Sequence, residues 1–306
     1  MAASTLTMAK TVSLTDYQPA YRVKADKRTW KWESVYKVGT TSRGTEQWFA
    51  YSGLPLAQLR GELEPVPYYD VQELGATTLT VVKYLLGSRF SNELVDDNQH
   101  LPNLMREVGA MIGESHAQVV DDYAALPFNR AWASTYQIVD PVNGTAALCA
   151  SHTLADGVTY SNLLTTAAPD TDVLLSALSQ YEWSRKNHAG LLATDKPNQV
   201  LFSSSKFPLW NKLLNNSVEP DTVERNDSFI KGYGLTPIVC PFLDTTTNWF
   251  ILGENFKQDA IFLWRKRMSV DEAYQDKDYR AVKIPSETRF GAVVKDYLSI
   301  LGNAGA

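Results

Sequence analysis

The sequence lacks any concentrated block of lysine and arginine. Its 29 Lys and Arg residues are spread along 306 residues and are outnumbered by 34 Asp and Glu, so the formal net charge is −5. A protein that grips nucleic acid through the phosphates needs a concentrated basic surface. We therefore expect no tight DNA binding, because a mildly acidic wall repels nucleic acid weakly and lets it move.

Patterns that bind metals or form disulfides are also missing. The two cysteines, Cys149 and Cys240, are far apart and fit no metal or redox spacing, so we interpret them as reduced thiols that act as small hydrophobic residues. The histidines form no HExxH motif and no His-x-His pair. They are His100, His116, His152 and His188. These absences predict no metal ion and no cofactor.

Motifs of catalysis are absent as well. The chain has no GxSxG and no Walker A motif, and the Gly-x-Gly at 232–234 lacks the third glycine of a dinucleotide site. The serines at 203–205 precede a predicted helix, where serine is typical of an N-cap. We therefore predict no catalytic residue and no enzyme. The alternative from another class is a cytoplasmic α+β hydrolase that uses Asp or Glu with His152.

Long hydrophobic runs do not occur. No apolar stretch approaches the ~18 residues of a membrane-spanning helix, and the first residues contain no apolar signal-peptide region. We expect a protein that is made in a cytoplasm and does not span a membrane. With 44% hydrophobic and 21% charged residues the composition is that of an ordinary globular protein.

Two segments near the start of the chain favour structures that need a neighbouring surface. Residues 1–30 are polar and weakly patterned, which predicts an arm that becomes ordered only on another surface. Residues 53–86 alternate as two strands do, with Gly75 at a turn, bulge or bend, and predict a long projection. An isolated hairpin is only marginally stable in water.

The strongest helical pattern lies between Asp96 and Leu126. An acidic start suits the positive end of the helix dipole, and Pro102 suits a first turn. Apolar residues then recur at steps of three and four until Pro127. The pattern predicts a helix of roughly seven turns. His116 lies near its apolar stripe and is predicted to pack there or at an interface rather than to catalyse.

The rest of the chain alternates short strands and helices. Asn143-Gly144 predicts a hairpin turn, residues 170–187 a helix, and residues 200–204 a strand that leads into a helix with Pro208 in its first turn. Mostly strands follow from residue 229. The long helix and the final strands must meet, since neither buries its apolar face alone. We therefore predict an α+β chain with two interleaved lobes.

Three segments in combination resemble the major head subunit of Mu-like and related tailed phages, a family with the HK97-like capsid fold. The first is WESVYKVGTTSRGTEQWFAYSGLPLAQLRGE, followed by a Thr- and Val-rich segment and the acidic residues 93–97. The second is LCASHTLADGVTYSNLL, in which His152, Gly157, Ser161 and Asn162 match a recurrent pattern. The third is RFGAVVKDYLSILG, which looks like the family's closing strand.

The resemblance implies a definite anatomy and assembly. It implies an N-terminal arm (1–39), an extended β loop (40–90), a peripheral domain (91–140 and 240–306) with a spine helix at about 96–126, and an axial domain (141–239). Subunits of this kind form hexamers and pentamers of an icosahedral head, the capsid of the virion, and assemble in the host bacterial cytoplasm. The implied partners are other copies, a scaffolding protein, a portal protein at one vertex, a decoration protein and weakly contacted double-stranded DNA, with no membrane.

Aromatic residues of the arm and loop are the predicted inter-subunit contacts, because large aromatic side chains are enriched at binding hot spots. They are Trp30, Trp32, Trp48, Phe49, Tyr68 and Tyr69. Packing inside the chain's own core is the alternative for each of them.

Departures from the family and rival shells complete the hypotheses. No long charged helical segment precedes the arm, which predicts a separate scaffolding protein unless an N-terminal extension is cleaved. Nothing identifies the Lys, Asn and carboxylate of a covalent crosslink. The rivals are an encapsulin-like nanocompartment shell of the same fold and a tail-tube or decoration protein, which usually lacks so long a central helix.

Overall fold

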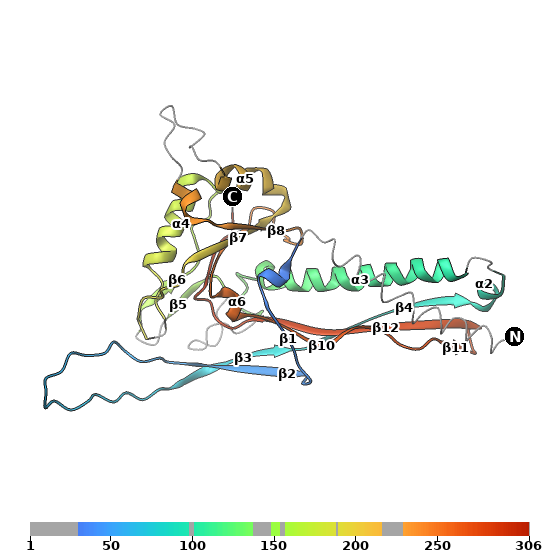
Figure 1. The fold of residues 1–306 in the computed structure, drawn as a ribbon, viewed down its shortest axis with the longest axis horizontal. Helices are drawn as coiled ribbons and strands as arrows, with labels where there is room; N and C mark the ends of the chain where they lie inside the picture. The colour runs from blue at the N-terminus through green and yellow to red at the C-terminus, as the bar shows by residue number, and fades with distance from the viewer. Residues whose placement is uncertain are drawn as a thin grey trace.

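The protein is an elongated molecule with two lobes and a long loop that extends from one end (Figure 1). The computed structural model describes residues 30–97, 101–136, 148–153, 157–187, 189–215 and 229–305. Among the helices in those ranges, none combines the length and the hydrophobicity that a membrane crossing requires. The predicted turn at Asn143-Gly144 and the predicted arm up to residue 29 lie outside the described residues.

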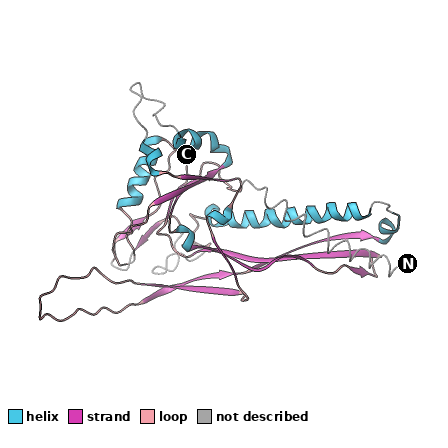
Figure 2. Cartoon of the chain, viewed as in Figure 1, coloured by secondary structure: helices cyan, strands magenta, loops and turns pink. Residues whose placement is uncertain are grey.

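One lobe, the slab, is a five-stranded sheet with one long helix along it (Figure 2). Strand β12 is central: it pairs antiparallel with β10 and β11 on one side and with β4 on the other, and β1 adds a parallel edge to β10. The strands are β1 (Lys37–Thr40), β4 (Val82–Ser91), β10 (Ala260–Val270), β11 (Tyr274–Asp276) and β12 (Ala281–Val294).

The predicted long helix is present, but both of its ends differ from the prediction. The acidic segment forms a separate short helix, α2 (Asn92–Asp97), and α3 runs over Leu101–Asn129. Proline lacks the N–H that continues a helix, so an end at Pro127 was expected. The helix continues because Phe128 is fully buried. In addition, the Asn129 amide donates to the carbonyl of Phe242 at 2.9 Å. Tertiary contacts therefore hold the last turn.

Contacts between α3 and the sheet close one core, as predicted. The Ser286 hydroxyl donates to the carbonyl of Leu86 at 2.7 Å and therefore accepts from Nε2 of His116, 2.8 Å away. Burial lowers the pKa of His116, which favours its neutral form. Tyr123 of the same helix meets Phe290 edge to face, with ring centroids 5.2 Å apart. His116 is thus a packing residue between helix and sheet.

The second lobe is a four-stranded sheet in the order β13–β9–β7–β8, covered by α4 and α5. Phe202 of β7 stacks on Trp210 of α5 with centroids 5.2 Å apart, which confirms the predicted strand and helix. The elements are α4 (Thr171–Trp183), β7 (Pro197–Ser203), η2 (Ser204–Lys206), α5 (Phe207–Asn215), η3 (Phe229–Tyr233), β8 (Thr236–Cys240), β9 (Trp249–Gly253) and β13 (Ile300–Asn303). Strands β9 and β13 thus lie in this lobe, although the resemblance implied a peripheral domain for 240–306.

Two small antiparallel pairs complete the fold. Strands β2 (Thr45–Tyr51) and β3 (Glu73–Thr80) form a projecting hairpin, and β5 (Ser151–Thr153) pairs with β6 (Thr159–Ser161). The prediction placed both strands of the projection within 53–86, but the first strand precedes that range and 52–72 are a loop. The register of the hairpin shifts by one residue beside Gly75, whose φ of 142° is unfavourable for other residues. The predicted irregularity at this glycine is therefore a β-bulge.

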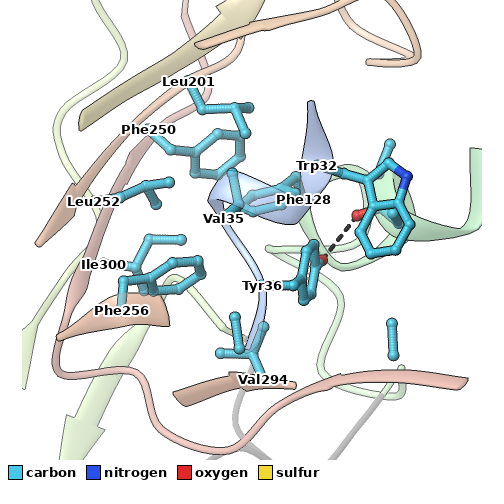
Figure 3. Close-up of a cluster of buried hydrophobic side chains, with 14 of the residues drawn as sticks. Trp32, Val35, Tyr36, Phe128, Leu201, Phe250, Leu252, Phe256, Val294 and Ile300 are labelled. Carbon is cyan, nitrogen blue, oxygen red and sulfur yellow. Dashed lines mark hydrogen bonds between the residues drawn. The ribbon is translucent and has the colours of Figure 1, made fainter. Parts of the chain in front are cut away.

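Two of the predicted contact residues, Trp30 and Trp32, lie in the core of their own chain. Trp30 and Trp32 are only 2% and 3% exposed, and Trp32 packs on Phe262 with centroids 4.3 Å apart. Figure 3 shows Trp32 and Tyr36 in this core, where the Tyr36 hydroxyl donates to the carbonyl of Ala124 at 2.8 Å. Side chains so fully covered by their own chain leave no surface for a neighbour. The burial of both side chains favours the alternative, packing inside the chain's own core.

The two lobes are joined where the chain crosses between them, at α6 (Phe256–Asp259) and after β12. The backbone N–H of Lys295 donates to the carbonyl of Asp259 at 2.9 Å, and Nζ of Lys295 lies 3.7 Å from the Asp259 carboxylate. The Ser299 hydroxyl donates to the same carboxylate at 3.4 Å. Burial, and then the nearby carboxylate of Asp296, raise the pKa of Asp259 to about 7, against the opposing effect of Lys295.

The raised pKa makes the crossing sensitive to pH. Folded Asp259 keeps its proton up to about pH 7, whereas the unfolded chain releases it near 3.8, the ordinary pKa of an aspartate. The free energy of unfolding should therefore fall as pH rises from about 4 to about 7. It should stay at this lower level above that range. We expect Asp259→Asn to remove this cost and to stabilise the subunit by about 2 kcal/mol above neutral pH, with a smaller gain near pH 5.

Urea unfolding of dilute, unassembled subunits at about pH 5 and pH 8 measures this difference. Asp278→Asn, on an exposed turn, is the matched control and should follow the native pH profile. Parallel profiles for the native protein and Asp259→Asn would contradict the prediction.

Candidate assembly surfaces

The loop 52–72, between β2 and β3, exposes large apolar side chains with no core beneath them. Leu59, Leu63 and Tyr68 are 101%, 99% and 90% exposed. The other exposed apolar side chains of this loop are Leu54, Leu56, Val66, Tyr69 and Val71. Monomeric soluble proteins rarely expose contiguous apolar surface on this scale, and larger patches mark interaction sites. The exposed apolar side chains make the loop a candidate interaction surface.

The hairpin that bears this loop is fixed firmly to the slab. Leu79 is 1% exposed and packs with Ile261 and Val293. Gly291 makes room for it, because a Cβ there would lie 2.7 Å from the Leu79 side chain. The Thr77 hydroxyl donates to the carbonyl of Lys295 at 3.4 Å. A rigid base thus holds the exposed loop away from the molecule, as Figure 1 shows.

Of the four remaining predicted contact residues, two lie on β2 at the base of the hairpin and two lie in the loop 52–72. Trp48 packs against the cluster around Leu79 and is half-buried. Phe49, Tyr68 and Tyr69 are exposed, so their role as contacts stays a prediction. The aromatic criterion missed the leucines of the loop. Their signal was available, because apolar residues among Pro, Gly and charged residues have no strand or helix partner to bury them.

The segment that includes His152 is structural. The Asn162 amide donates to the carbonyls of Leu148 and Tyr297 at 2.7 and 3.1 Å, and its oxygen accepts from the backbone N–H of Ala150 at 2.8 Å. His152 is fully buried and stacks on Tyr297 with centroids 3.6 Å apart. A histidine in this position cannot reach a substrate, so the geometry gives the hydrolase alternative no support.

The other groups considered for chemistry are also explained by packing. Cys149 and Cys240 are buried free thiols, as predicted, and burial raises the pKa of Cys240 to about 12. Within the described ranges, no three His, Cys, Asp or Glu side chains gather as a metal site would require. Ser203 ends β7 and Ser205 lies in η2; their hydroxyls hydrogen-bond each other at 3.3 Å, and Ser203 makes no side-chain cap hydrogen bond to η2.

Comparison with known proteins gives the identification. Residues 75–303 match a family model described as phage capsid protein. The chain belongs to this family. No curated protein matches.

Solved phage structures share the fold. One from Microbacterium phage Oxtober96 has a TM-score of 0.55 at 11% identity and covers 91% of this chain and 92% of its own. The capsid of cyanophage P-SCSP1u has a TM-score of 0.53 at 11% identity, with 90% and 88% covered. The capsid of Myoviridae phage XM1 has a TM-score of 0.51 at 11% identity, with 88% and 90% covered.

The capsid subunit is therefore a structural, non-enzymatic protein with an HK97-like α+β fold. It is a major capsid protein, which self-associates to form the phage head and is located in the capsid of the virion. The encapsulin-like alternative is not favoured. The Mu-like branch of the family stays a prediction.

Proposed function

We propose that this capsid subunit assembles as hexamers and pentamers into an icosahedral head around double-stranded DNA, and that its loop 52–72 covers a neighbouring subunit. The exposed apolar side chains of the loop are the observation that supports this role. Interfaces bury such residues at their centre. Phe49, Tyr68 and Tyr69 would contact the neighbour together with Leu59 and Leu63.

The two lobes have corresponding roles in the proposed shell. The slab with α3 is the peripheral domain, and the lobe of β7, β8, β9 and β13 is the axial domain. A scaffolding protein acts during assembly in the host bacterial cytoplasm, a portal protein occupies one vertex, and a decoration protein is a further partner. The net charge of −5 supports only weak, non-specific contact with the packaged DNA.

Electron microscopy of the purified protein tests the proposal. Hollow shells of uniform size, made of hexamers and pentamers, are the expected result. Particles from infected cells should in addition hold DNA and a tail, which a nanocompartment lacks. A protein that stays a monomer at high concentration, even with its scaffolding protein present, would overturn the proposal.

A further inference from the structure

The first residues of the loop 52–72 touch the second lobe of their own chain. A Cβ added to Gly53 would lie 3.1 Å from Cβ of Ala189 and 3.9 Å from its backbone nitrogen. Gly53 also has a φ of 73°, which residues other than glycine rarely adopt. The backbone of the loop therefore comes this close to Ala189 only because residue 53 is a glycine.

The part of the second lobe that meets Gly53 is a tight turn, here called the stop turn and made of Asn187 and residues 189–191. The side-chain oxygen of Asn187 accepts from the backbone N–H of Ala189 at 3.0 Å and from that of Leu191 at 2.9 Å. The backbone N–H of Asn187 donates to the carbonyl of Leu191 at 2.8 Å, and that of Gly190 donates to the carbonyl of Asn187 at 2.9 Å. These hydrogen bonds give the turn a defined shape.

Arg185 anchors the stop turn to the second lobe. Its side chain is completely buried, and its guanidinium donates to the carbonyls of Leu298 and Asp195 at 2.7 and 2.6 Å. On the other side of the turn, the backbone N–H of Ala193 donates to the carbonyl of Arg185 at 2.9 Å. A turn held by a buried side chain at its start should move only together with its lobe.

The hairpin that carries the loop has a point at which it can bend. The register of β2 and β3 shifts beside Gly75, and a bulge with a glycine tolerates changes in strand direction. On one side of the bulge the hairpin is packed around Leu79. On the other side, Ser52 and Gln72 hold the two ends of the loop together, but a two-stranded ribbon is only marginally stable in water. Bending at the bulge would redirect the loop unless a further contact limits it.

We propose that the stop turn is a positioning contact, which fixes the direction of the loop 52–72 in the free subunit before the loop meets a second copy of the chain. This inference rests on the proposed function, because it concerns the loop that covers the neighbour. A loop that is ordered before it binds loses less conformational entropy on binding. The contact also links the loop to the second lobe, since any displacement of Ala189 with that lobe changes the direction in which the loop points.

An engineered disulfide tests the contact in the free subunit. Gly53→Cys with Ala189→Cys brings two Cβ atoms close to the ~3.5–4.5 Å that a disulfide spans, so mild oxidation of dilute subunits should crosslink nearly all chains internally. Cys149 and Cys240 are buried and should not compete. The control pair, Gly61→Cys from the middle of the loop with Ala189→Cys, should stay reduced. Electrophoresis without reductant measures the crosslink, and little crosslinking of the first pair, or equal crosslinking of both pairs, overturns the proposal.

A second variant tests the role of the contact in assembly. Asn187→Ala removes the two side-chain hydrogen bonds of the stop turn and should lower the yield of shells about fivefold, the effect of one or two lost neutral hydrogen bonds. Asn211→Ala, at an exposed position of α5 in the same lobe, is the matched control and should leave the yield unchanged. Asn187→Ala in the oxidised Gly53→Cys, Ala189→Cys subunit should recover the yield, because the disulfide then replaces the contact. A purely structural role of Asn187 would give no such recovery.

The outcomes separate the two proposals. Native protein that forms no shells overturns the proposed function, whereas the crosslink in the free subunit does not depend on assembly. Oxidised subunits that form shells only after reduction would overturn the positioning role, because the contact would then have to open. An unchanged yield for Asn187→Ala, or no recovery in the oxidised subunit, overturns it as well. Circular dichroism and thermal melting of the unassembled variants show that they are folded.

Discussion

Replacing residues 53–71 with Asn-Gly is expected to abolish shell assembly and to leave the subunit folded. The backbone N–H of Ser52 donates to the carbonyl of Gln72 at 2.9 Å, and the N–H of Gln72 donates to the Ser52 hydroxyl at 3.1 Å. These bonds hold the two ends of the loop together, and Asn-Gly is a favoured two-residue hairpin turn. The base packed around Leu79 is unchanged, so the melting temperature should stay within a few degrees of the native value.

The expected loss of assembly follows from the apolar surface that is removed. Burying one large apolar side chain contributes about 1.5 kcal/mol or more. Loss of three large apolar side chains of the loop would weaken each contact between two subunits by about 4–5 kcal/mol. This corresponds to about a thousandfold loss of affinity. Leu59→Ser with Leu63→Ser should give an intermediate yield, whereas Gln58→Ala in the same loop is the matched control. Size-exclusion chromatography and electron microscopy measure the shells, and wild-type yields from the shortened subunit would contradict the prediction.

The sequence predicted the elements whose signal is local. The apolar repeat of α3 and the irregularity at Gly75 depend on neighbours within a few residues, so both were recognisable without the structure. The end of α3 was not recognisable from the sequence. Asn129 holds the last turn through the carbonyl of Phe242, which is more than a hundred residues away. The lobe to which β9 belongs depends in the same way on its pairing with β7.

The assembly surfaces were only partly predictable for a related reason. A tryptophan is equally suited to a core and to an interface, and only the contact of Trp32 with Phe262 decides between them. A projection was predicted from residues 53–86, but residues 53–72 were interpreted as strand, whereas they form the loop between β2 and β3. The alignment of Lys83, Arg289 and Lys266 across the slab was not predictable, since these residues become neighbours only through the register of three strands.

Arg185→Met is expected to destabilise the subunit by about 3–5 kcal/mol, because it breaks a buried ion pair. The Arg185 side chain is completely buried, and its guanidinium lies 3.5 Å from the Asp195 carboxylate. It also donates to the carbonyls of Tyr181, Leu298 and Asp195 at 2.7, 2.7 and 2.6 Å. Methionine fills similar space but leaves these acceptors and the carboxylate without their donor. Urea unfolding of the unassembled subunit measures the loss.

A second substitution separates the destabilising effect of the unpaired Asp195 charge from the effect of the lost Arg185 hydrogen bonds. The carboxylate of Asp195 keeps the Tyr181 hydroxyl at 2.8 Å and the N–H of Asn255 at 3.1 Å, so part of its charge remains solvated by the protein. Adding Asp195→Asn to Arg185→Met removes that charge and should recover about 1–2 kcal/mol. Arg185→Lys keeps the charge and loses most of the forked hydrogen bonds, so it should lie between native and Arg185→Met. A loss below about 1 kcal/mol for Arg185→Met would show that this cluster does not hold α4 to the crossing segment at Leu298.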